Sequence, residues 1–70
     1  MKLSARNLLK GKISEIREGQ VTAVVTVDIG GGNLLTSSFT MTALRDLGLT
    51  KGLQVVAIIK ASEVILGTQD

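Results

Sequence analysis

An alternating run of apolar residues occupies the second quarter of this 70-residue chain. Its odd-numbered positions from 21 to 29 are all apolar, and they read Val21, Ala23, Val25, Val27 and Ile29. Because successive side chains of a strand point to opposite faces, this pattern predicts a β-strand with one buried face. Gly30-Gly31-Gly32-Asn33 follows with residues that tolerate positive φ, and a second apolar stretch runs from Leu34 to Met41. The sequence therefore predicts an antiparallel hairpin here.

The remaining segments predict the rest of a small all-β domain. Looser alternation predicts a first strand from about Asn7 to Arg17, before a turn at Glu18-Gly19. Thr42 is the expected N-cap of one or two helical turns that end at Gly48. Two further strands are expected over residues 53–60 and 63–67. This order predicts a single domain, residues 1–70, folded as a five-stranded OB-like barrel with one short helix between strands 3 and 4.

Composition indicates how such a small domain becomes stable. A core built from 70 residues leaves folding only marginally favourable, and the absence of Cys and His removes disulfides and a structural zinc site. The chain is nevertheless 44% hydrophobic, with a mean hydropathy of +0.38. We therefore expect a homo-oligomer, in which other subunits cover part of the apolar surface.

Several classes of function are disfavoured by the residues present. Without His there is no base for a nucleophilic Ser or Thr, and the carboxylates fall at turns or on polar faces, so no enzyme is expected. The glycine run joins strand to strand and not strand to helix, unlike a phosphate-binding loop. Phe39 is the only aromatic residue and shares its strand face with Leu35 and Met41, so it is assigned to the core. Nucleic-acid binding therefore stays a remote alternative.

The chain shows no sign of a membrane or export segment. No apolar run approaches the roughly 20 residues of a membrane-spanning helix, and the first residues lack the continuous apolar segment of a signal peptide. We expect a cytoplasmic protein without a membrane partner.

Two hydroxyl–cation pairs are the most informative polar feature. They are Ser4-Ala5-Arg6 and Lys60-Ala61-Ser62. Residues i and i+2 of an extended backbone face the same way, so each tripeptide presents one hydroxyl and one positive charge to the same side. Such a set of donors suits an oxyanion, whereas the alternative for each pair alone is a solvated strand face.

The two pairs, together with Leu9-Lys10-Gly11 after the first and Ile59 before the second, resemble the molbindins of the Mop family, which are Mop/TOBE-like domains. The resemblance covers essentially the whole chain. It implies a cytoplasmic protein that stores molybdate or tungstate at subunit interfaces of a hexamer, a trimer of dimers. It implies no cofactor and no metal cation bound directly by the protein. A docking module without its own ligand, serving a transporter or regulator, is the alternative.

The resemblance also implies the site residues. They are Ser4, Arg6, Lys60 and Ser62, with the backbone N–H groups of Ala5 and Ala61 and, on the third strand, the hydroxyl of Thr40. A second anion site is expected at the turn formed by Gly19, Gln20, Val21 and Thr22. Molybdate accepts hydrogen bonds and donates none, so it needs donors around it. The Glu63 carboxylate is a hydrogen-bond acceptor, and strand alternation is expected to turn it away from Lys60 and Ser62.

Overall fold

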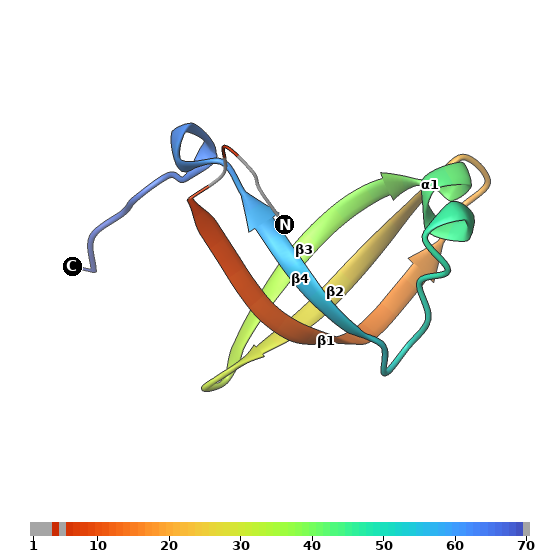
Figure 1. Cartoon of the computed structure of the whole chain (residues 1–70), viewed down its shortest axis with the longest axis horizontal. Helices are drawn as coiled ribbons and strands as arrows, with labels where there is room; N and C mark the ends of the chain where they lie inside the picture. Colours follow the sequence, from red (N-terminus) through yellow and green to blue (C-terminus); the bar gives the residue numbers. More distant parts are fainter. Residues whose placement is uncertain (1–3, 5, 70) are drawn as a thin grey trace.

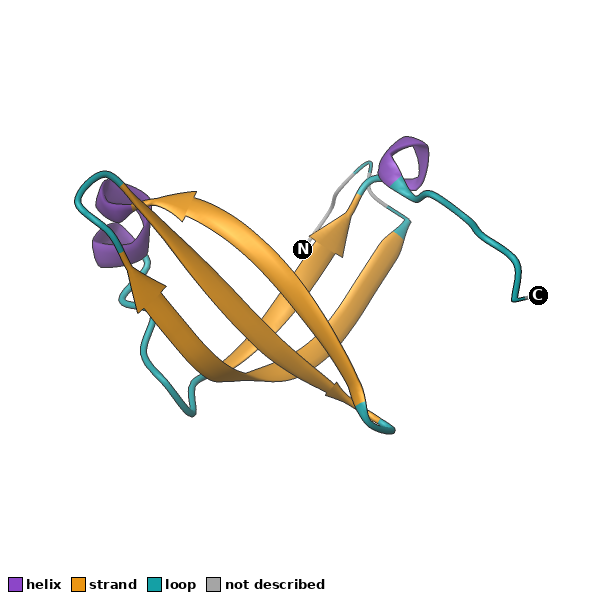
Figure 2. Ribbon diagram, turned by 180° about the vertical axis from the view of Figure 1, so that it is seen from behind, coloured by secondary structure: helices purple, strands orange, loops and turns teal. Residues whose placement is uncertain are grey.

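The computed structural model describes residue 4 and residues 6–69, which form one curled antiparallel sheet with a short helix at one end (Figures 1 and 2). The elements are β1 (Asn7–Glu18), β2 (Thr22–Gly30), β3 (Asn33–Thr40), α1 (Met41–Asp46), β4 (Gln54–Ile59) and the single 3₁₀ turn η1 (Ala61–Glu63). The strand order in the sheet is β3-β2-β1-β4. The sheet therefore remains open between the edges of β3 and β4.

The long strand β1 joins the two halves of the sheet. Its first half pairs with β4 and its second half with β2, and Lys12 has a partner on each side. The register with β2 shifts between Ile13 and Glu15, where the Ser14 hydroxyl donates to the carbonyl of Thr26 at 3.2 Å. This bulge resets the alternation, so that Ile13 is buried and Ile16 also packs against the core.

The predicted hairpin between β2 and β3 is confirmed. Gly30, Gly31 and Gly32 have φ values of 93°, 63° and 79°, in the region that glycine adopts without steric cost. Asp28 accepts a hydrogen bond from the Gly30 N–H at 2.8 Å, and the Asn33 side-chain amide donates to the Gly30 carbonyl at 3.2 Å. The glycine run is thus a strand-to-strand turn.

The helix α1 is confirmed, but its predicted N-cap is wrong. Thr40, not Thr42, caps α1, because its hydroxyl accepts the Ala43 N–H at 3.1 Å. The helix begins directly after β3, where the Met41 N–H donates to the Val21 carbonyl at 2.7 Å. The predicted end of the helix is confirmed by Gly48, which has a φ of 64°.

The core lies where α1 covers the curled sheet. Its buried members come from three of the elements and are Ile13, Ala23, Val25, Val27, Met41 and Leu44. Phe39 packs against them and is partly buried, which confirms its assignment to the core. The strand carrying it therefore offers no exposed aromatic platform for stacking bases.

The predicted fifth strand over residues 63–67 is wrong for the single chain. Residues 61–63 form η1, and no strand follows in the described residues, which end at 69. The side chains of Ile65 and Leu66 are 94% and 89% exposed. A strand needs a hydrogen-bonding neighbour, and in Figure 1 the tail leads away from the sheet. The all-β class with one helix before β4 is confirmed, whereas the barrel is a four-stranded, open one.

Candidate functional site

The pairing of β1 with β4 brings the two hydroxyl–cation pairs together. Arg6 directly precedes β1 and Lys60 directly follows β4, and the outermost pair of that ladder is Asn7 with Ile59. The ladder is antiparallel and ends at this pair, so Arg6 and Lys60 each lie one residue beyond it, at the same corner of the sheet. Figures 1 and 2 both show the start of β1 beside the end of β4 at this corner of the sheet. Two motifs from opposite ends of the sequence thus form one cationic edge.

Asn7 holds this corner with its side chain as well as its backbone. Its side-chain amide donates to the Ile59 carbonyl at 3.3 Å, across the last pair of the ladder. Sequence reasoning quoted Asn7 within a motif but gave it no role. The signal was its place as the first residue of the strand, next to Arg6, where an amide can bridge to the neighbouring strand.

All four side chains of the edge are accessible. Ser4, Arg6, Lys60 and Ser62 are exposed, and so is Ala61, whereas Ala5 lies outside the described residues. Within the described part of the chain, neither Arg6 nor Lys60 forms an ion pair with a carboxylate. Both charges are therefore available to an external anion.

The turn η1 contributes backbone donors to the same edge. Its hydrogen bonds run from the Glu63 N–H to the Lys60 carbonyl at 2.9 Å and from the Val64 N–H to the Ala61 carbonyl at 3.2 Å. The N–H groups of Ala61 and Ser62 take no part in these two bonds, as expected for the start of a helical turn. The 3₁₀ turn includes Ser62 and Glu63, so strand alternation applies to neither residue. The predictions that alternation turns Ser62 to the side of Lys60 and turns Glu63 away from it are therefore wrong.

The one ion pair of the described residues lies away from this edge. The Arg17 guanidinium is 2.9 Å from the Glu15 carboxylate, in the half of β1 that pairs with β2. The hydrogen bond and positive charge of Arg17 lower the pKa of Glu15, and Glu15 raises the pKa of Arg17 in return. Both side chains are largely exposed, so this pair contributes little to stability.

Thr40 is not brought to the cationic edge within one chain. It pairs with Thr22 at the other end of β2 and β3, beside α1, and its hydroxyl is already the acceptor of the helix cap. In Figure 1, α1 and the η1 turn lie at opposite ends of the molecule. Thr40 therefore lies next to the second candidate site, not next to Lys60.

The second candidate site, at residues 19–22, is an exposed tight turn. The Gly19 N–H donates to the Thr22 carbonyl at 2.8 Å, and the Val21 carbonyl accepts from Met41. The Gly19 donor is thus occupied within the turn, which leaves the N–H groups of Gln20 and Val21 and the Thr22 hydroxyl as candidate donors. A side chain at Gly19 would meet the Thr22 carbonyl at 2.8 Å, so glycine is required there.

The described residues contain no group of three or more Asp or Glu side chains that could hold a metal ion. None of their helices is long and apolar enough to cross a membrane.

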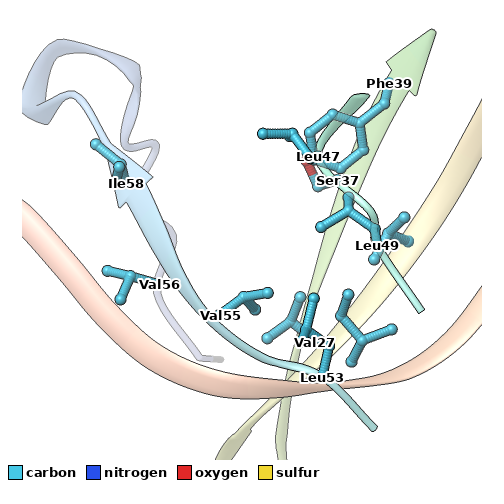
Figure 3. Close-up of a pocket in the computed structure, with 11 residues that line it drawn as sticks. Val27, Ser37, Phe39, Leu47, Leu49, Leu53, Val55, Val56 and Ile58 are labelled. Atoms are coloured by element: carbon cyan, nitrogen blue, oxygen red, sulfur yellow. The ribbon is translucent and has the colours of Figure 1, made fainter. Parts of the chain in front are cut away.

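An apolar groove between β3 and β4 was not predicted from the sequence. Figure 3 shows Ser37 and Phe39 of β3 on one side of it and Val55, Val56 and Ile58 of β4 on the other. The groove has a volume of about 520 Å³. It lies between the two edge strands of the open sheet, an arrangement that a local sequence pattern does not reveal.

These features define a small open β-barrel domain that joins its two chain ends in a cationic, hydroxyl-bearing edge. The chain belongs to the TOBE domain family, which matches residues 3–66. It is 49% identical over 69 residues to a probable molybdenum-pterin-binding protein of Haemophilus influenzae, covering 99% of this chain and 100% of that protein. The resemblance to the Mop family is confirmed.

Solved structures agree with this assignment. MopII from Clostridium pasteurianum superposes with a TM-score of 0.88 at 37% identity, over 96% of this chain and all of that one. The cytoplasmic molybdate-binding protein ModG, solved with molybdate bound, gives a TM-score of 0.92 at 46% identity. That match covers 99% of this chain and 49% of the ModG chain.

Proposed function

We propose that this protein binds molybdate and stores it in the cytoplasm, without catalysing a reaction. The ligands are the side chains of Ser4, Arg6, Lys60 and Ser62, assisted by backbone N–H groups of Ala5 and Ala61. The observation that supports the proposal is the β1–β4 ladder, because its last pair, Asn7 with Ile59, directly adjoins Arg6 and Lys60. Relatives named for molybdenum-pterin or molybdate binding support it.

The chemistry of the edge matches the chemistry of the ion. Molybdate is a tetrahedral dianion that accepts hydrogen bonds and donates none, and this edge offers two cations, two hydroxyls and backbone N–H groups. Arg6 and Lys60 together balance the two negative charges. Tungstate has the same charge and shape, so we propose that it binds at the same place.

We further propose that the site is completed between subunits of a homo-oligomer, a hexamer built as a trimer of dimers. In one chain the edge is exposed, and a unit charge pair at 4 Å is worth only about 1 kcal/mol in water, compared with about 4 kcal/mol at an effective dielectric of 20. A neighbouring subunit that excludes water would strengthen every contact to the anion. Within its own subunit, Thr40 lies at the opposite end of the sheet from Lys60. It would therefore join the edge from another subunit. The turn at residues 19–22 remains the proposed second anion site.

Native mass spectrometry tests these proposals together. The protein is measured alone and with molybdate, tungstate or sulfate, each at the same concentration. We expect a hexamer that takes up discrete molybdate or tungstate increments and does not take up sulfate. A hexamer indifferent to molybdate would contradict the proposed function.

The apolar groove supports a second candidate, a docking module for a transporter or regulator. This alternative predicts no uptake of any of the three anions. The Arg6→Ala variant is the control, because it should strongly reduce discrete uptake in the first case and change nothing in the second.

A further inference from the structure

We propose that Asn7 is a positioning residue of the anion site, which holds Lys60 in place relative to Arg6 without touching the anion. This inference rests on the proposed function, molybdate binding at the cationic edge, and gives that site a residue outside its set of donors. It starts from one hydrogen bond between two strands that are far apart in the sequence.

The side chain of Asn7 is bonded to the peptide group directly before Lys60. Its amide donates to the Ile59 carbonyl at 3.3 Å, and that carbonyl belongs to the peptide bond between Ile59 and Lys60. A peptide group is planar, so a bond to its carbonyl restrains the direction in which the chain enters Lys60. The main chain of Asn7 is joined directly to Arg6. Asn7 is therefore linked to both cations, to Arg6 by a covalent bond and to the Lys60 peptide by a hydrogen bond.

The strand pairing that could restrain Lys60 ends at this point. Asn7 with Ile59 is the last pair of the β1–β4 ladder, and the chain then turns into η1. Lys60 is the N-cap of η1, in an extended conformation with φ −64° and ψ 133°, and its side chain makes no capping bond. Strands fray from their ends, where few contacts oppose opening. The Asn7 amide is thus the side-chain bond that restrains the Lys60 backbone where the ladder stops.

The two cations need such a restraint before an anion arrives. Arg6 and Lys60 are both exposed and adjoin the same end of the ladder, so their like charges favour separation of the two strands. Long cationic side chains also lose rotamer freedom when they converge on one ion. Holding their backbones at a fixed separation beforehand leaves less to be ordered on binding. We therefore expect Asn7 to raise the affinity for a dianion.

The other asparagine of the chain offers a matched control. Asn33 makes the same kind of bond, from its side-chain amide to the Gly30 carbonyl at 3.2 Å. It lies in the β2–β3 hairpin, which Figure 1 shows at the lower end of the sheet, away from the η1 turn. Asn7→Ala and Asn33→Ala each remove one such bond, but only the first bond lies next to the cations. A purely structural role would make the two variants alike in molybdate binding.

A double-mutant cycle tests whether Asn7 acts through Lys60. Molybdate is titrated calorimetrically into the native protein, Asn7→Ala, Lys60→Ala and Asn7→Ala/Lys60→Ala, with assembly checked by native mass spectrometry. We expect Asn7→Ala to raise Kd about fivefold, the size of effect that one hydrogen bond contributes. In the Lys60→Ala background the same change should raise Kd less than about twofold, because the side chain to be positioned is gone. Asn33→Ala should have less than about a twofold effect in either background.

Three results of the cycle would overturn the proposal. Equal losses from Asn7→Ala with and without the Lys60 side chain would mean that Asn7 acts on the fold as a whole. A loss of the same size in Asn33→Ala would mean the same. An unchanged Kd in Asn7→Ala would show that the bond does not serve the site.

A second measurement uses the native chain and does not depend on the folding of a variant. Asn7 and Asn33 are its two asparagines, so NMR spectra contain few side-chain amides to assign. Molybdate should shift the side-chain amide signals of Asn7 and leave those of Asn33 in place. Bound molybdate without a change at Asn7 would overturn the proposal. Native protein that binds no molybdate would contradict the proposed function and this inference with it, so the two failures are distinguishable.

Discussion

Replacing Lys60 by Ala should weaken molybdate binding far more than replacing Lys12 by Ala, although both residues are exposed lysines of the β1–β4 region. A unit charge about 4 Å from a dianion contributes roughly 2 kcal/mol even at the dielectric constant of water. Its loss corresponds to about a 30-fold increase in Kd, and more where a second subunit excludes water. Arg6→Ala should have an effect of the same size.

The register of the sheet sets the expectation for Lys12. It pairs with Gln54, six residues along the chain from Lys60, which is about 20 Å of extended strand. At that distance the attraction to a dianion is about 0.4 kcal/mol before screening, and a Debye length of about 8 Å in 0.15 M salt removes most of it. Lys12→Ala should therefore change Kd less than two-fold.

Isothermal titration of molybdate into the three variants at 0.15 M salt makes the comparison, with the assembly state of each checked by native mass spectrometry. Equal losses for Arg6, Lys60 and Lys12 would refute the reasoning, because they would indicate diffuse attraction to a basic protein. Losses confined to Arg6 and Lys60 would place the anion at the corner where the two chain ends meet.

Four further outcomes are expected. Gly11→Ala should cost roughly 2 kcal/mol of unfolding free energy in urea titrations, since the new Cβ would lie 2.6 Å from Val27 Cγ1, while Gly67→Ala, with nothing within 4 Å, should cost nothing measurable. Thr40→Ala should lose about 1 kcal/mol with the helix cap, and Thr40→Ser should retain most of it; equal stability of the Ala variant would contradict the cap. Molybdate at 100 times its Kd should stabilise the protein by about 2.7 kcal/mol, so an unchanged Tm would count against binding to the folded form. Glu63→Gln should tighten molybdate binding by removing a like charge next to Ser62 in the η1 turn, and weaker binding would assign Glu63 a supporting role.

The strands of this fold could be predicted because their signals are local. The alternation from Ala23 to Val27 has the period of a strand, and the glycine run that follows permits only a tight turn, so β2, the hairpin and β3 followed directly. The cap of α1 was misassigned because Thr40 and Thr42 offer the same hydroxyl. The choice depends on where β3 ends, and the pairing of Thr40 with Thr22 fixes that point.

The fifth strand and the site needed information that local patterns do not hold. Residues 64–66 have strand composition, but whether they form a strand depends on a partner edge, and the described chain offers them none. The hydroxyl–cation motifs each looked like a solvated strand face. Their meeting depends on contacts between Asn7 and Ile59, 52 residues apart, and only the family resemblance anticipated it.

The proposed site lies at the end of the β1–β4 ladder, where the charges of Arg6 and Lys60 favour binding of an anion. Arg6 and Lys60 carry like charges directly beyond the last pair of the β1–β4 ladder, and like charges opposite one another on paired strands repel. Ladder ends open more readily than their centres, and Asn7 is the last side chain that ties this one together. A dianion between the two cations would turn that repulsion into attraction and extend the closed ladder by one pair. Binding of the anion and ordering of this corner of the sheet would then be the same event.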